Sequence, residues 1–454
     1  MPKIQQTNKI KGTRDVMPDE SLYWNYALNV TEEVVLSAGV DKIETPILEK
    51  FEIYEKIFKD ENESILNSIY SFEPAKSDGS KKKKGSKEEG TFSLRPEIIP
   101  GIARMYIENN MQSWTKPLSL YTIGKCFKND NSQTGRNKEF NQMAVEIIGE
   151  EDPMIDANII SLAWDITRKL KIDDAEIHIN SMGCPDCRPK IKKSLNEYFK
   201  KKQSKLCDDC KKKMKKNTIG ILACKNEKCQ NTIASAPLSI DNICDDCKKN
   251  FMSVLEYLDE MGVIYNLAPN LVRENDYHNK TVFEISIGQE RKHTLLGGGG
   301  RHDHLIERLG GEQTPAIGLE INIDLLAEYI KSNNIKIPKN KSKVNVFIIQ
   351  LGESAKKIAI KKAKELRKLG ISTGIAIGKD TIKAQLKSAE KVNALFSIII
   401  GQREAVTNTS LVRDMRDGVQ ETIELDDLNV RIFNMVEERI KEETEYTKKM
   451  RMKK

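Results

Sequence analysis

Cysteine pairs are the clearest sign of chemistry in this sequence. Eight of its nine cysteines lie from Cys184 to Cys247, in four pairs whose partners have two or four residues between them. Four thiolates at such spacing bind one zinc ion, so the segment predicts up to two structural zinc sites, with reduced surface cysteines as the alternative. The spacing does not indicate which pairs share a metal. The predicted ligands are Cys184, Cys187, Cys207, Cys210, Cys224, Cys229, Cys244 and Cys247.

Lysines surround these cysteines, in residues 190–193, 200–202 and 211–216. A zinc-stabilised segment with this charge suits the phosphate backbone of a nucleic acid. All-cysteine zinc sites are usually closed, and the chain has no HExxH helix, so zinc-dependent hydrolysis finds little support. The ninth cysteine, Cys126, stands apart and is predicted to be an unreactive core residue.

Two further pairs of polar residues have spacings that suit ligand binding. Arg95 and Glu97 would share one face of a strand, because alternate residues point the same way; a surface ion pair is the alternative. Gln142 and Glu146 share a face of an otherwise apolar strand and need partners if they are buried. Arg95 and Glu97 suit a ligand with both a phosphate and an amine, and a small polar cationic ligand would provide partners for Gln142 and Glu146. The glycine run 297–300 permits close backbone approach to such a ligand, or else forms a flexible turn.

The elements that must position these residues have readable patterns. A helix is expected over Ser21–Ser37, and a long hairpin over Leu118–Lys125 and Asn141–Gly149. Further strands are expected at Glu176–Asn180, at Thr281–Ile287 and in the segment that ends at Leu296. Residues 75–90 are charged and of low complexity, which favours a solvated loop between two strands.

The pattern changes after Ser332–Ser342, which is typical of a linker. Buried-type strands and amphipathic helices then alternate as β-α-β-α-β between Val344 and Gly401, which predicts a compact α/β module. The last segment, Val430–Lys454, is expected to form a charged helix or tail.

Bulk composition places few limits on function. The chain has 454 residues, of which 39% are hydrophobic and 31% charged, with a net charge of +7. This mild positive charge permits a polyanionic partner without requiring one. No apolar run is long enough to span a bilayer, and the first residues lack the apolar region of a secretory signal. We therefore expect a cytoplasmic protein.

Several motifs, in order, resemble those of the histidyl-tRNA synthetases, a class II aminoacyl-tRNA synthetase family. The resemblance runs from about Lys11 to about Val430. The segment ETPILEKFEIY at 44–54 resembles motif 1 of the family. The segment LRPE at 94–97, together with the hairpin up to Glu146, resembles motif 2. The motifs KGTRDVMP at 11–18, LVRENDYHNKTVFEI at 271–285, GGGRHD at 298–303, LRKLGI at 366–371 and VRDMRDG at 412–418 also match the family pattern.

The resemblance implies an α+β catalytic domain built on an antiparallel class II sheet, with a Cys-rich insertion and a C-terminal α/β anticodon-binding domain. Motif 1 implies a homodimer. The expected boundaries are 1–182 and 251–331 for the catalytic core, 183–250 for the insertion, 332–342 for the linker, 343–430 for the anticodon-binding domain and 431–454 for the charged C-terminal helix or tail.

The implied activity is the ATP-dependent attachment of histidine to histidine tRNA through a histidyl-adenylate, with Mg²⁺ accompanying ATP. Arg95 and Arg273 would be catalytic and would neutralise the α-phosphate. Glu97, Gln142, Glu146, Tyr277 and His278 would bind histidine. Lys128, Arg136, Gly298, Gly299 and Gly300, together with the two arginines, would contact ATP phosphates or the tRNA acceptor end.

Departures from the family pattern cluster near the expected ATP site. In GLEINIDLL at 318–326, Asn322 replaces a glycine, Asp324 a glutamate, and Leu325 the arginine that grips adenine and the γ-phosphate. Losing one such contact costs roughly 10²–10³ in rate. Lys128 replaces an arginine, and it cannot reproduce a bidentate fork. The remaining departures are Ile99, Glu274, Asn275, His278 and His302, of which the two histidines each replace a tyrosine.

Two functions therefore remain open. Leu325 and Lys128 favour a catalytically impaired paralogue that binds histidine or tRNA in a regulatory role. The anticodon-binding module, Gln142, Glu146 and Arg273 favour a ligase. A protonated His302 could partly replace the lost charge at ATP.

Overall fold

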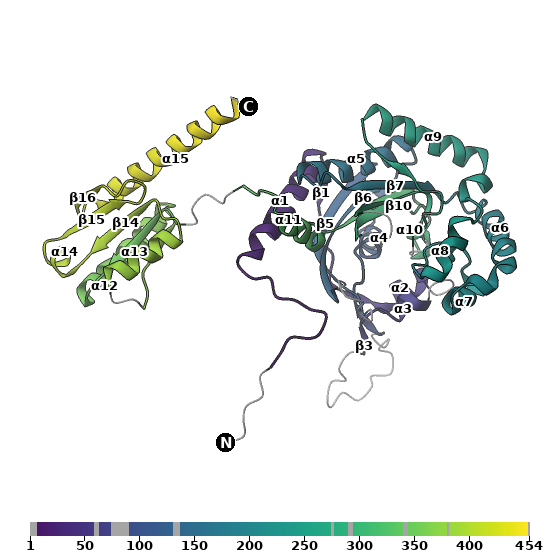
Figure 1. Cartoon of the computed structure of the whole chain (residues 1–454), viewed down its shortest axis with the longest axis horizontal. Helices are drawn as coiled ribbons and strands as arrows, with labels where there is room; N and C mark the ends of the chain where they lie inside the picture. Colours follow the sequence, from purple (N-terminus) through teal and green to yellow (C-terminus); the bar gives the residue numbers. More distant parts are fainter. Residues whose placement is uncertain are drawn as a thin grey trace, which may run out of the picture. The chain divides into compact units, whose positions relative to one another are not determined.

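The chain forms two compact units, Met1–Ile337 and Pro338–Lys454. They are drawn in the computed structural model of Figure 1. The structure describes residues 7–58, 63–73, 90–129, 137–273, 277–288, 294–338, 344–378 and 381–452. The division at Ile337 falls inside the segment predicted as a linker. In the described residues, no helix is long and apolar enough to cross a membrane.

The first unit is built on an eight-stranded sheet with the order β1-β5-β6-β11-β10-β9-β7-β8. All pairs from β5 to β7 are antiparallel, as the resemblance implied. The two outermost strands pair parallel, because long connections bring them back to the sheet edges. The strands are β1 (Asp41–Lys42), β5 (Leu118–Phe127), β6 (Glu139–Ile148), β7 (Glu176–Ser181), β8 (Asn266–Leu267), β9 (Asn279–Ile287), β10 (Thr294–Arg301) and β11 (Ala316–Asn322).

The two faces of this sheet have different environments. On β6, Met143, Val145 and Ile147 point into the main core, because alternate residues share a face. Helices α1 (Glu20–Ser37), α5 (Pro153–Lys169), α9 (Asp245–Glu260) and α11 (Ile323–Ser332) contribute buried residues to that core. The opposite face carries Gln142 and Glu146. The predicted hairpin and N-terminal helix are thus confirmed.

A smaller sheet has the order β2-β4-β3, and the helices that follow β2 and β4 contribute buried residues to a second core cluster. Its strand β4 ends at Leu94, so the prediction that one strand presents both Arg95 and Glu97 is wrong. Pro96 has no N–H for a strand ladder, and the chain turns there into α4. The elements here are β2 (Leu48–Lys50), β3 (Ser71–Phe72), β4 (Phe92–Leu94), α2 (Phe51–Phe58), α3 (Glu63–Leu66), α4 (Ile99–Glu108) and α10 (Leu305–Arg308).

The cysteine-rich segment folds as a helical insertion between β7 and α9. It contains α6 (Arg188–Lys201), α7 (Asp208–Lys216) and α8 (Glu227–Ala234). Its small core combines cysteines with apolar residues such as Leu195 and Phe199. Short 3₁₀ turns occur at Met111–Ser113, Gln203–Lys205, Ile219–Ile221 and Ser239–Asn242.

The second unit confirms the predicted β-α-β-α-β module and extends it. Its sheet has the order β13-β12-β14-β15-β16, and the last two strands are antiparallel additions. Leu428, Ile432 and Val436 of α15 are buried, so the predicted C-terminal tail starts as a packed helix. The elements are β12 (Val346–Gln350), α12 (Glu353–Lys368), β13 (Thr373–Ile375), α13 (Ile382–Lys391), β14 (Phe396–Ile400), α14 (Gln402–Val406), β15 (Thr409–Asp414), β16 (Gln420–Glu424) and α15 (Leu428–Met452).

Candidate active site

Carboxylates gather on the polar face of the central sheet, two of them buried and that of Glu284 partly exposed. Glu146 on β6, Glu284 on β9 and Glu320 on β11 share this face, as the strand register requires. Sequence reasoning missed Glu284 and Glu320. The signal that singled out Gln142 and Glu146, a polar residue in an apolar strand, also applies to these two.

Glycines make room for the charged side chains on this face. A Cβ atom on Gly318 would lie 1.9 Å from Glu146 Oε1, and one on Gly298 would lie 2.8 Å from Arg273 Nη1. The run 297–300 is therefore not a flexible turn: it lies within the central strand β10. Contact of Gly298, Gly299 and Gly300 with a phosphate stays a prediction.

Glu97 and the aromatic residues before β9 form one end of the site. Tyr277 donates its hydroxyl hydrogen to Glu97 Oε1 at 3.0 Å. Its ring stacks on His278 at a centroid distance of 4.5 Å, and His302 stands edge-on to both rings. Each of these four side chains is at most 4% exposed. The structure thus brings together three of the predicted histidine-binding residues.

Glu146 is paired with His302. His302 Nε2 lies 2.9 Å from Glu146 Oε2, and Nδ1 lies 3.1 Å from the carbonyl oxygen of Gly300. Burial alone would lower the pKa of His302, but the charge and hydrogen bond of Glu146 raise it above its usual range. Both ring nitrogens of His302 thus face protein acceptors, and partial compensation of the lost charge at ATP by His302 stays a prediction.

Arg273 lies between two of the carboxylates. Its Nη1 is 3.3 Å from Glu284 Oε1, and its Nη2 is 3.9 Å from Glu320 Oε2. Burial, followed by the charge of Glu97, raises the pKa of Glu320 to about 8 despite Arg273. Glu320 Oε1 is buried and has no hydrogen-bond partner in the described part of the chain. A cation would complete this arrangement.

The other predicted arginine, Arg95, is held by backbone groups. Its Nε donates to the carbonyl of Lys125 at 2.9 Å, and Nη1 donates to the carbonyl and hydroxyl of Thr45. Its Nη2 lies flat on Gly124, where a Cβ would come within 1.8 Å. These contacts tie the motif 1 segment to β5. Phosphate binding by Arg95 stays a prediction.

The remaining predicted residues lie close to the carboxylates or outside the described chain. Gln142 Oε1 accepts from the backbone N–H of Ile98 at 3.1 Å and from the thiol of Cys126 at 3.4 Å. Cys126 is fully buried, as expected. The positive charge of Lys128 acts to lower the pKa of Glu320. Arg136, Glu274 and Asn275 lie outside the described residues.

The motif 3 departures have structural roles. Asn322 caps α11, because its Oδ1 accepts from the N–H of Leu325 at 3.1 Å. Asp324 accepts from Trp24 Nε1 at 3.0 Å and from the N–H of Asn141 at 2.6 Å. Leu325 is partly buried against the main core. These residues hold α11 to the start of β6.

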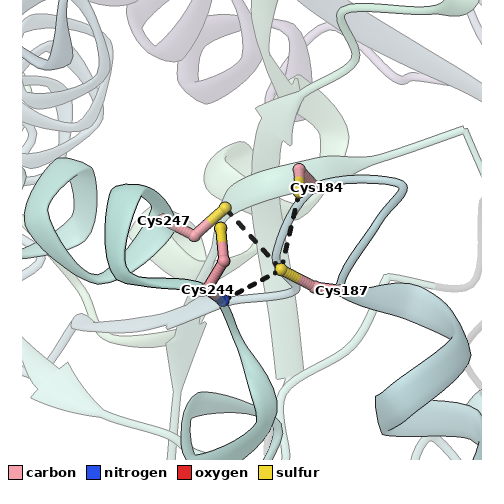
Figure 2. A group of neighbouring side chains, drawn as sticks. All are labelled: Cys184, Cys187, Cys244 and Cys247. Atoms are coloured by element: carbon pink, nitrogen blue, oxygen red, sulfur yellow. Dashed lines mark hydrogen bonds between the residues drawn. The ribbon is translucent and has the colours of Figure 1, made fainter.

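The cysteines form two separate clusters of four. The ligand atoms within each lie no more than 4.8 Å apart. The first cluster, drawn in Figure 2, joins the first and last pairs, and Cys187 Sγ lies 3.5 Å from Cys184 Sγ and 4.0 Å from Cys247 Sγ. The second joins Cys207, Cys210, Cys224 and Cys229. Backbone N–H groups of Cys244 and Cys207 donate to cluster sulfurs at 3.1 Å, which favours thiolates.

Comparisons with known proteins agree with this geometry. A family model described as histidyl-tRNA synthetase matches residues 12–326, and one described as anticodon binding domain matches residues 345–432. The histidine–tRNA ligase of Halothermothrix orenii is 34% identical over 94% of this chain and 97% of its own length. That of Caldicellulosiruptor bescii is 37% identical over 92% and 96%. The crystal structure of apo S. aureus histidyl-tRNA synthetase matches with a TM-score of 0.74 and 29% identity, over 94% of this chain and all of that one.

Proposed function

The chain belongs to the histidyl-tRNA synthetase family, and we propose that the buried carboxylate site on its central sheet carries out the histidine chemistry of that family. The protein is a ligase that charges histidine tRNA in two steps. The carboxylate of histidine first attacks the α-phosphate of ATP, which forms histidyl-adenylate and releases pyrophosphate. The histidyl group then passes from the adenylate to a hydroxyl of the tRNA, and AMP is released. No observation favours the regulatory alternative.

Each end of the site suits a different part of the reactants. Glu97, held by Tyr277, is suited to the ammonium group of histidine, because a carboxylate attracts a cation strongly in a buried site. Glu146 is suited to the imidazole. Arg273 is placed to neutralise the charge that develops on the α-phosphate. Glu284 and Glu320 beside it are suited to the Mg²⁺ that accompanies ATP, because Mg²⁺ prefers oxygen ligands.

The main observation behind this proposal is the position of Arg273 between the buried Glu320 and the partly exposed Glu284 on one sheet face. Its test is ATP–pyrophosphate exchange with each of the common amino acids. We expect exchange with histidine alone. Exchange that is absent with histidine, or equal with another amino acid, would contradict the proposal.

Leu325→Arg tests the weakened ATP contact. The family pattern has an arginine here, and a restored guanidinium should raise the exchange rate at low ATP about tenfold or more, since one such contact contributes roughly 10²–10³ in rate. Leu325→Met is the matched control, because it keeps the apolar packing against the core. If Leu325→Arg folds and exchanges no faster than Leu325→Met, another group holds the nucleotide.

We also propose that each cysteine cluster binds one structural zinc ion. Four thiols that face one another within zinc-binding reach suit a closed tetrahedral site. Zinc in the first cluster would tie the start of the insertion to α9, and zinc in the second would hold the inner helices. Chemistry at these closed sites is not expected.

Single substitutions separate the two zinc sites. Cys184→Ser and Cys224→Ser each replace a partly buried thiol of one cluster. Each variant should lose about one zinc per chain from a wild-type content of about two, measured by elemental analysis. Cys126→Ala should retain both ions, since Cys126 is in neither cluster. A wild-type protein purified without zinc, with all its thiols freely titratable, would argue against the sites.

The partners named by the resemblance remain proposals. The motif 1 segment exposes Ile47 and Leu48, at 41% and 47%, which suits the predicted homodimer interface. The lysines of α6 and α7 suit the acceptor end of histidine tRNA. The cytoplasmic location stays a prediction.

A further inference from the structure

Glu146, the residue suited to the substrate imidazole, is paired with a second histidine of the protein, His302. The pair comes from β6 and from the residue directly after β10, and each side chain is at most 2% exposed. His302 Nδ1 faces a carbonyl oxygen, which only accepts hydrogen bonds. Its Nε2 faces a carboxylate, which also only accepts when ionised. Both ring nitrogens therefore need a hydrogen, as in an imidazolium ion.

The second oxygen of Glu146 has a different environment. Glu146 Oε1 is buried and has no hydrogen-bond partner within the described residues. It lies against Gly318, whose missing side chain provides the space. Glu146 therefore offers a single open acceptor, on a carboxylate whose charge is already balanced by His302.

We propose that His302 is a specificity-determining residue that makes this pocket select the neutral imidazole of histidine over the protonated form. The inference rests on the proposed function of the site. A balanced Glu146–His302 pair attracts a further cation much less than an unpaired Glu146 would, whereas its open oxygen can accept one N–H from a neutral ring. A protonated substrate ring would lie close to the His302 charge and would be disfavoured.

The other charged groups around the pair do not change this balance. Asp303, beside His302, is already paired with Arg301 and Lys280. Tyr277 and His278 contribute rings from the segment before β9, and Tyr277 is hydrogen-bonded to Glu97. Glu320 on β11 faces Arg273. The negative charge that faces His302 directly is that of Glu146.

The kinetic test measures the KM for histidine in pyrophosphate exchange between about pH 5.5 and 8.5. In the wild type, KM should rise about tenfold per pH unit below the pKa of the substrate imidazole, near 6.5, while kcat changes less. His302→Gln retains an N–H donor for Glu146 but carries no charge. Its KM should rise about tenfold at pH 8, and the increase at acid pH should flatten or reverse, because an unbalanced carboxylate attracts imidazolium.

Two further variants control for folding and for a general histidine effect. His302→Tyr places the family's usual residue at the position and should behave like His302→Gln. His304→Gln changes an exposed histidine that contacts Glu307, and its profile should match the wild type. A wild-type KM that stays flat or falls toward acid pH overturns the inference. So does an acid rise that persists in both folded His302 variants.

A spectroscopic readout tests His302 without substrate. In protein labelled with ¹⁵N-histidine, the His302 ring should keep the imidazolium shifts at pH 8, identified by their absence in His302→Gln. Titration of this ring near its ordinary pKa of about 6.5 overturns the inference. Absence of exchange with histidine at every pH would instead count against the proposed function, and the spectrum would still decide the state of His302.

Discussion

Replacing Arg301 with methionine is expected to destabilise the catalytic unit by about 3–5 kcal/mol, because it leaves a buried carboxylate without its cation. Arg301 and Asp156 are both completely buried, with Arg301 Nε 2.7 Å from Asp156 Oδ1. Arg301 also pairs with Asp303 and donates to the carbonyls of Glu150 and Asp152. Urea unfolding of the wild type and Arg301→Met provides the measurement.

The pH dependence of this loss gives a sharper test. Burial raises the pKa of Asp156 from its ordinary 3.8 to about 6, despite the neighbouring Arg301. Between about pH 4 and pH 6 this group ionises in the unfolded protein but not yet in the folded protein. The folded protein therefore loses stability as pH rises through this range. Without Arg301 the folded pKa rises further. The destabilisation by Arg301→Met should therefore be larger at pH 8 than at pH 5.

Two further variants distinguish the stability lost by leaving the Asp156 carboxylate unpaired from the stability lost through poorer packing. Arg301→Met with Asp156→Ala removes both partners and should recover part of the stability that Arg301→Met loses. Lys280→Met removes the other cation near Asp303, a side chain that is 21% exposed, and should cost less than about 1 kcal/mol. Equal losses in Arg301→Met and in the double variant would mean that packing accounts for the effect.

Arg273→Met is expected to slow histidyl-adenylate formation by about 10²–10³, with a smaller effect on folding. Arg273 is the cation between Glu284 and Glu320, and its loss would remove the positive charge that faces the incoming phosphates. The pKa of Glu320, already about 8, would rise further. Single-turnover adenylate formation at saturating histidine and ATP isolates this step.

Two matched variants accompany this measurement. Arg273→Lys keeps the charge but loses the guanidinium fork, and should fall between the wild type and Arg273→Met. Arg431→Met removes an exposed arginine of the second unit and should leave adenylate formation unchanged. Wild-type rates in Arg273→Met would assign the α-phosphate to another cation, with Arg95 and Lys128 as the next candidates.

Much of the architecture could be predicted from the sequence, because its signals are local. The hairpin around Gln142 and Glu146, helix α1 and the β-α-β-α-β module each follow from apolar periodicity within one short segment. The cysteine pairs indicated two metal sites by composition and spacing alone. Polar residues in apolar strands indicated a buried ligand site, although the same signal was overlooked at Glu284 and Glu320.

Which residues meet was decided by the tertiary structure. Nothing local links His302 to Glu146, which are 156 residues apart, or the first cysteine pair to the last. Arg95 was expected to share a strand face with Glu97, but its strand ends at Leu94, and its guanidinium contacts the backbone of Thr45 and Lys125. Periodicity fixes which face a side chain occupies within its own element. Its partners depend on the register and closure of strands that are distant in sequence, and that information lies in the packing of the whole sheet.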